Sequence, residues 1–213
     1  MHLQVGLLLD GQHGQANASA LDSLTTGPLG MLNVLETQLG LLRQEPSGAD
    51  RVLQYRELLK LLDAPQRFYH LSFAVDELGT SASLLSWRDQ FHIHVLIVAK
   101  LAALGSSPSR RLRDMAALES LVLGKLAPSV GERLAIVDSV LQRFSARIDL
   151  LTLVEPLSWW PVAWQHVLAR LNPVERSTVG AAAPQGTMLG SLQRALLANN
   201  PSSTESPPLH WLD

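Results

Sequence analysis

The turn Gly27-Pro28-Leu29-Gly30 is the first part of this sequence whose residue types and spacing suggest chemistry. A Walker loop holds the phosphates of a nucleotide with glycine-rich backbone amides, one lysine and one hydroxyl side chain. Here Gly27 and Gly30 stand between an expected strand and an expected helix, so a helix N-terminus would face an anion. The lysine and the hydroxyl are missing. We interpret Gly27 and Gly30 as a vestigial phosphate-loop position, with a simple tight turn as the plainer alternative.

The lysines exclude two further kinds of site. The chain has three of them, Lys60, Lys100 and Lys125. Only Lys125 follows a glycine, and Leu126 stands after it instead of a hydroxyl residue, so no intact Walker loop is expected. Metal-dependent nucleases of the PD-(D/E)xK kind place an acidic residue two positions before a lysine. Leucine, valine and leucine occupy those positions here, so no nuclease centre is expected in this chain.

His92 and His94 are the pair that most suggests a metal site. On a helix, two residues separated by one project to nearly opposite faces. Neither histidine has a histidine or an acidic residue four positions later, and cysteine is absent from the chain. HExxH and GxSxG motifs are missing as well. We therefore predict core or surface histidines, no metal ligands, no cofactor and no catalytic residues in this chain.

Arg110, Arg111 and Arg113 form the densest basic cluster, at the start of an expected helix. They are candidates for weak contacts with the phosphates of DNA, beside the plainer interpretation of a solvated helix start. The whole chain has a net charge of −2 and a pI of about 6.4, so it has no global basic field. Any contact with DNA is therefore expected to be local.

The segment Trp87-Arg88-Asp89 predicts a structural ion pair between Arg88 and Asp89, next to a tryptophan in the core. Trp159 and Trp160 are expected to pack the last long helix of the chain. These aromatic residues therefore favour a structural role over base stacking.

Hydrophobic periodicity predicts the elements that position these residues. Apolar runs and alternation predict strands at 3–9, 21–26, 67–75 and 148–154. Apolar residues at steps of three and four predict helices. Asp50 is the expected N-cap of the second helix. The helices are expected near 31–42, 50–64, 80–104, 112–122, 134–144, 158–171 and 188–198.

The alternation of strands and helices predicts an α/β fold, a parallel sheet with flanking helices. Two consecutive helices without a strand between them predict an inserted helical hairpin. The expected organisation is an α/β region at 1–107, the hairpin at 108–147, the return of the α/β region at 148–198 and a flexible tail at 199–213.

The first residues and the longest apolar run indicate where in the cell the protein is expected. The first residues lack the cationic start of a signal peptide. The longest apolar stretch, 95–104, is interrupted by Lys100 and is too short to span a bilayer. We expect a cytoplasmic protein with no membrane partner.

Three stretches together resemble a known family. They are Gly27-Pro28-Leu29-Gly30-Met31-Leu32 with Leu35 to Leu41, then Arg67-Phe68-Tyr69 with Ser72-Phe73-Ala74 and Asp76, then Leu78-Gly79-Thr80 with Leu84-Leu85 and Trp87-Arg88-Asp89. They look like the N-terminal part of bacterial PD-(D/E)xK nuclease-family proteins similar to the AddB subunit of ATP-dependent helicase–nuclease complexes. The resemblance covers about residues 20–95.

The resemblance implies a P-loop-NTPase-like, helicase-like fold that has lost its ATP site. It also implies that a nuclease domain follows in the parent protein, an exonuclease of DNA recombination and double-strand break repair. This chain would then be a catalytically inactive scaffold whose partners are single-stranded DNA and a helicase subunit.

A second interpretation comes from another functional class. The chain could be a protein-interaction or regulatory α/β domain with no role in nucleic-acid binding. An exposed apolar groove along the expected hairpin, able to bind a helix of a partner, would distinguish this interpretation from the first. An enzyme acting on small molecules is the least favoured, because no acid–base pair stands at a credible spacing.

Overall fold

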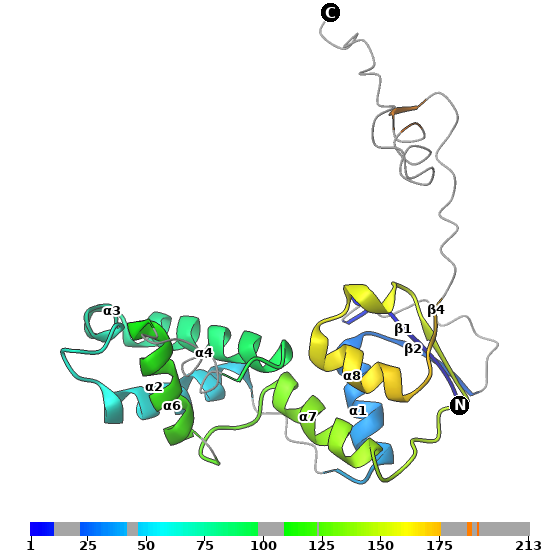
Figure 1. Cartoon of the computed structure of the whole chain (residues 1–213), viewed down its shortest axis with the longest axis horizontal. Coiled ribbons are helices and arrows are strands. Elements are labelled where there is room, and N and C mark those ends of the chain that lie inside the picture. The colour runs from blue at the N-terminus through cyan, green and yellow to red at the C-terminus, as the bar shows by residue number, and fades with distance from the viewer. Residues whose placement is uncertain are drawn as a thin grey trace, which may run out of the picture. The chain divides into compact units, whose positions relative to one another are not determined.

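The computed structural model describes residues 1–10, 22–41, 47–97, 109–122 and 124–175, with residues 187, 188 and 191. The chain divides into two compact units, Met1–Arg176 and Ser177–Asp213. All the elements described below belong to the first unit (Figure 1). The expected helix at 188–198 and tail at 199–213 lie almost entirely outside the described residues.

The elements of the first unit are β1 (His2–Val5), β2 (Ser23–Thr26), α1 (Pro28–Gln38), α2 (Gly48–Leu62), α3 (His70–Val75), α4 (Glu77–Ile93), α6 (Arg110–Val122), α7 (Val130–Leu141), β3 (Leu150–Leu153), the short 3-10 helix η1 (Leu157–Trp159), α8 (Val162–Arg170) and β4 (Val174–Glu175).

The four strands form one parallel sheet in the order β2-β1-β3-β4. Leu3 pairs with Leu151 and Val5 with Leu153, and all four side chains are buried. The alternating residues of β1 and β3 are half-buried or exposed. Because side chains alternate across a strand, one face of the sheet carries the apolar residues that pack against helices. The parallel α/β sheet expected from the sequence is confirmed, as are three of its four expected strands.

Two hydrophobic cores stabilise the first unit. The first joins the buried face of the sheet to α1, α7 and α8, and its largest members are Trp160 and Trp164. The second joins α2, α3, α4 and α6, which gather into one bundle in Figure 1. Its centre is formed by Tyr55, Tyr69 and Phe73, with Met115 and Leu118 of α6. The sheet is therefore positioned by one set of helices, and a separate bundle carries most of the aromatic residues between 55 and 91.

The strand expected at 67–75 is wrong, because this segment contains helix α3. Tyr69 and Phe73 stand four residues apart, which places both on one side of a helix. Both are buried in the second core, where their rings form a T-shaped, edge-to-face contact with centroids 6.2 Å apart. Leu71 and Val75 point outward. Packing in the bundle therefore decides the structure of a segment that also showed partial alternation.

Helix α4 is shorter than the helix expected at 80–104, since it ends at Ile93. The amide of Leu96 donates to the carbonyl of Phe91 and the amide of Val95 to that of His92, which is the Schellman pattern of a helix end. Val95 has a φ of +57°, which is costly for a β-branched residue. Trp87, which the sequence predicted in the core, is about half exposed, and so is Val95.

The expected helical hairpin is divided between the two cores. Helix α6 packs against α2 in the second core, whereas α7 packs against α4, α8 and α1. The two helices therefore do not pack on each other as a hairpin, and each joins a different layer.

Two helix starts are fixed by hydroxyl caps. Ser47, not Asp50 as expected, caps α2, and its Oγ accepts a hydrogen bond from the amide of Asp50 at 3.0 Å. Ser129 and Glu132 form a reciprocal capping box at the start of α7. Among the described residues, no helix is both long enough and apolar enough to cross a membrane.

Candidate functional site

The turn from Gly27 to Gly30 lies at the start of α1, directly after the edge strand β2. The carboxylate of Asp10 accepts hydrogen bonds from the amide of Leu29, at 2.9 and 3.1 Å, and from that of Gly30, at 3.4 Å. Amides at a helix N-terminus are the groups that hold phosphate in a working loop. The side chain of Asp10 therefore stands where an anion would bind.

Close packing accounts for both glycines of the turn. A Cβ added at Gly27 would collide with the backbone and the carboxylate of Asp10. A Cβ added at Gly30 would collide with Oγ1 of Thr26. The two glycines thus fit the tight turn, the plainer interpretation of this segment, without any nucleotide.

Two further carboxylates lie at the carboxyl ends of the strands. Oε2 of Glu155, after β3, accepts a hydrogen bond of 2.9 Å from the amide of Leu7, after β1. Oε1 of Glu175 accepts one of 2.9 Å from the amide of Leu157. Strand order reverses between β1 and β3, which is where parallel sheets usually bind ligands. At this edge, backbone amides already donate hydrogen bonds to negatively charged carboxylates. The negative charge would repel a phosphate group, so this edge is not suited to phosphate binding.

Arg110, Arg111 and Arg113 lie in the first turn of α6, and all three side chains are exposed. Among the described residues, no carboxylate lies within ion-pair distance of these three guanidinium groups. Arg110 donates a hydrogen bond to the carbonyl of Gln66. The structure thus brings the three predicted residues together on one exposed turn, with their charges free of carboxylate partners.

A fourth arginine, Arg67, lies next to this turn, but Asp114 balances its charge. Arg67 donates to Asp114 at 2.7 Å, and Asp114 also accepts a hydrogen bond from the amide of Phe68. Arg67 and Asp114 line a shallow depression of about 570 Å³ together with Gln66, Arg110 and Arg113. The net charge of this depression is positive, because three guanidinium groups face one carboxylate.

Aromatic rings extend the basic turn. The guanidinium carbon of Arg111 lies 6.0 Å from the ring centroid of Phe68 and 6.0 Å from that of Trp87. Such a cation over an aromatic face contributes roughly 0.5–1 kcal/mol at an exposed site. Trp87 is 45% exposed. We call Arg110, Arg111, Arg113 and Trp87 the arginine–tryptophan surface.

A second group of charges lies inside the bundle around Arg88, which is 1% exposed. Its guanidinium donates two hydrogen bonds of 2.9 Å to Glu119 of α6 and two, of 2.6 and 3.0 Å, to Glu132 of α7. Neighbouring Asp89 accepts instead from Arg51 of α2, at 2.8 Å for one of the two contacts. The expected pair of Arg88 with Asp89 is only a long contact of 3.8 Å.

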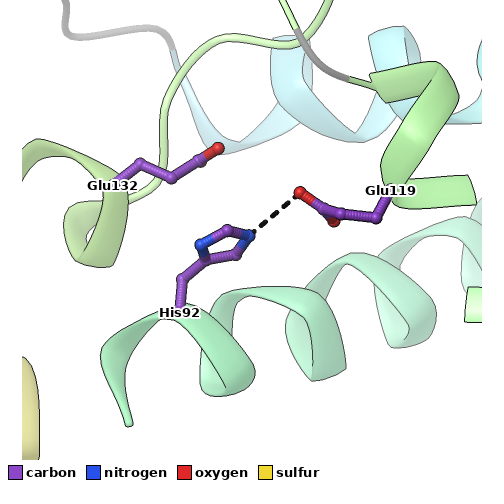
Figure 2. A group of neighbouring side chains, drawn as sticks. All are labelled: His92, Glu119 and Glu132. Atoms are coloured by element: carbon purple, nitrogen blue, oxygen red, sulfur yellow. Dashed lines mark hydrogen bonds and ion pairs between the residues drawn. The ribbon is translucent and has the colours of Figure 1, made fainter. Parts of the chain in front are cut away.

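Histidine 92 completes this group. Figure 2 shows His92 of α4 pointing between Glu119 and Glu132, and its Nε2 lies 3.2 Å from Oε1 of Glu119. The three residues come from three helices that are far apart in the sequence. We call Arg88, His92, Glu119 and Glu132 the Arg88 network.

The network lowers the pKa of both glutamates. Burial by itself would raise the pKa of Glu132, but the hydrogen bonds from Arg88 and from the Ser129 amide outweigh it and bring the pKa to about 2. Burial would likewise raise the pKa of Glu119, and the hydrogen bonds from His92 and Arg88 lower it below its usual value. Both carboxylates are therefore ionised at neutral pH.

The same residues offer ligand atoms of the kind that a metal binds. One nitrogen of His92 and one oxygen from each of Glu119 and Glu132 lie within 4.8 Å of one another. Zinc binds such atoms at about 2.0–2.2 Å. The guanidinium of Arg88 already holds both carboxylates, and a divalent cation there would be repelled by this fixed charge. We therefore describe the group as an ion-pair network that connects α4, α6 and α7.

A cavity of about 390 Å³ adjoins the network, and His92 and Glu119 form part of its wall. Most of its lining is apolar, with Leu134 and Ala163 among the buried members. The described residues that line it include no serine, threonine, cysteine or lysine, so they offer no hydroxyl, thiol or amine nucleophile. The His92–Glu119 pair could move protons but has no nucleophile beside it.

Sequence reasoning found the arginines of α6 and missed the Arg88 network. It considered only partners four residues from the histidines, whereas Glu119 is 27 residues from His92 and Glu132 is 44 from Arg88. The one available signal was the spacing of Ser129 and Glu132, which is that of a capping box.

No model of a known protein family matches the chain, and no curated protein matches it in sequence. The likeness to AddB-type proteins therefore depends on the three stretches quoted for it.

Proposed function

We propose that the chain is a catalytically inactive scaffold that binds single-stranded DNA through its arginine–tryptophan surface. In this proposal it is the helicase-like segment of an ATP-dependent exonuclease of the PD-(D/E)xK family, and it acts with a helicase subunit in break repair. The observation that carries the proposal is one exposed turn, where Arg110, Arg111 and Arg113 have no carboxylate partner among the described residues and Arg111 lies over Trp87.

The contacts of Asp10 at the start of α1 support the proposal that the chain is catalytically inactive. A P-loop-like ancestor would present the amides of this turn to a triphosphate. Here the carboxylate of Asp10 occupies the amides of Leu29 and Gly30, so that the loop carries negative charge where phosphate would bind. A helicase-like segment with this loop supplies architecture without ATP turnover.

The binding part is supported by the chemistry of the basic turn. Guanidinium groups pair with backbone phosphates, and aromatic rings stack on unpaired bases, largely without regard to sequence. Three contacts to phosphate would give a modest affinity that falls with salt. Each contact to a single strand adds about 0.7 to the slope of log affinity against log salt.

Fluorescence anisotropy with a labelled DNA single strand tests the proposal. Arg110→Gln with Arg113→Gln removes two of the three contacts, so the salt slope is expected to fall from about 2 to about 0.7. Arg143→Gln with Arg147→Gln is the matched control, since it removes the same charge from two exposed arginines elsewhere. Equal loss in both variants would show that only net charge matters, and absence of binding at 20 mM salt would end the proposal.

The second candidate, a protein-interaction domain, is favoured by a different observation. The outward faces of α3 and α4 expose large apolar side chains, among them Leu71, Val75 and Leu78. This face lies on α3 and α4, not along the helices of residues 108–147 where the sequence predicted a groove.

A further inference from the structure

The outward face of α4 carries no charge over most of its length. From Leu78 to Trp87 its exposed or half-buried positions are leucine, glycine, threonine, alanine, serine, serine and tryptophan at 78, 79, 80, 82, 83, 86 and 87. A surface helix normally places charged residues on its solvent face. Three of these seven positions carry a glycine or serine at spacings of four and three, which allows another helix to approach closely.

Helix α3 extends this face with larger apolar groups. Leu71 is 79% exposed and Val75 is 89% exposed. A concave surface of about 700 Å³ lies between these side chains and Gly79, Ser83 and Trp87 of α4. Exposed side chains of this size around a concave surface are typical of a protein-interaction site. We call Leu71, Val75, Leu78 and Trp87, with the small residues between them, the α3–α4 face.

Opposite charges lie at the two ends of this face. Asp76, at the N-terminus of α4, borders the concave surface, and its side chain is exposed. Arg111 covers Trp87 at the other end. Eleven residues of helix separate Asp76 from Trp87, which corresponds to about 16 Å.

This order of charges fits a second copy of the same chain. A two-fold axis through the middle of the face would place two α4 helices antiparallel, with Asp76 of each copy opposite Arg111 of the other. The apolar side chains of α3 would then meet across the axis. We infer that the α3–α4 face is a self-association surface that forms a symmetric dimer.

The inference can be tested apart from the proposed binding of DNA, although Trp87 and Arg111 belong to both surfaces. The other side chains that bury apolar area in the dimer belong to α3 and α4, whereas Arg110 and Arg113 contact phosphate only. The double variant of these two arginines is expected to remain dimeric, and a variant in α3 is expected to bind DNA. Failure of one proposal is thus distinguishable from failure of the other.

Sedimentation equilibrium of the full chain between about 5 and 500 µM tests the inference, because interfaces below about 1,200 Å² form transient dimers. The wild type is expected to dimerise in this range. Leu71→Glu is expected to weaken the dimer at least tenfold, since it places two carboxylates at the apolar centre. Leu61→Glu, which changes a leucine that is 70% exposed on α2, is the matched control and should leave the dimer intact.

The charged ends provide a second measurement. Asp76→Asn keeps an N-cap of α4 but removes the charge, and is expected to weaken the dimer about threefold at low salt and much less at high salt. A chain that is monomeric at 500 µM overturns the inference. A dimer that responds equally to Leu71→Glu and Leu61→Glu also overturns it, because association would then use another surface.

Discussion

Charged side chains have different roles in the two halves of helix α6. In its first turn, Arg110, Arg111 and Arg113 are exposed and have no carboxylate partner among the described residues. In its second half, Glu119 is held by Arg88 and His92 inside the bundle. The difference shows which charges stabilise the fold and which remain available to a partner. Four experiments separate these roles, from the largest expected effect to the smallest.

Arg88→Met should have the largest effect. It leaves Glu119 and Glu132 half-buried without the guanidinium that holds both, and breaking one side of a buried ion pair costs about 3–5 kcal/mol. Urea denaturation of the full chain measures the free energy of unfolding. Arg113→Met is the control at the exposed end of α6 and should change this free energy by less than about 0.5 kcal/mol. Equal losses of unfolding free energy in the two variants would mean that charges at the two ends of α6 contribute equally to stability.

Acid should weaken the same network. The folded-state pKa of Glu132, about 2, and the lowered pKa of Glu119 lie below the value of 4.5 for a free glutamate. Stability from these groups is therefore complete above pH 4.5 and is lost as the pH falls toward 2. The expected loss is roughly 2 kcal/mol after allowance for solvent screening. Arg88→Met should lose much less over this range, and a parallel pH dependence in both proteins would contradict the assignment.

Asp10→Ala tests the start of α1, where the sequence predicted a vestigial phosphate-loop position. It removes the carboxylate that accepts from the amides of Leu29 and Gly30, and loss of such a cap costs about 1 kcal/mol. Thermal unfolding measures the loss. Added phosphate should stabilise the variant more than the wild type, because the amides are then free. No difference in the response to phosphate would show that this turn lacks the shape for an anion.

Arg110→Gln with Arg113→Gln should change stability least, by less than about 0.5 kcal/mol, although it changes the binding of DNA most. The reason is that neither side chain has a charged partner in the part of the chain that the structure describes. Chemical denaturation and anisotropy on the same sample compare the two effects. A large loss of stability would place these arginines in the fold rather than on a binding surface.

Local patterns predicted the strands of the sheet because they appear in the sequence as short apolar or alternating runs. Leu3, Val5, Leu151 and Leu153 stand at every second position of β1 and β3, and each is buried. The same reasoning failed at 67–75, where Tyr69 and Phe73 fit a helix as well as a strand. Only the second core, supplied by α2, α4 and α6, distinguishes the two.

The candidate site was predictable only where it is local. Three arginines within four residues are visible in the sequence, and the structure places them on one exposed turn. The carboxylate of Asp10 at the Gly27–Gly30 turn was not predictable, because it comes from the segment after β1 and stands 19 residues before Leu29. The Arg88 network combines three helices, so that no spacing within one segment reveals it.

The position of β1 in the sheet has a consequence for the order of folding. Its neighbour β3 pairs His2 with Leu150, so one edge of the first strand stays open until about 150 residues have left the ribosome. The second core needs only residues 52–126 and can form earlier. Contacts that close long loops form slowly, and an unpaired strand edge invites aggregation. In the described sheet, β1 therefore waits longer for its neighbour β3 than for β2, and its pairing with β3 is expected to be a late step of folding.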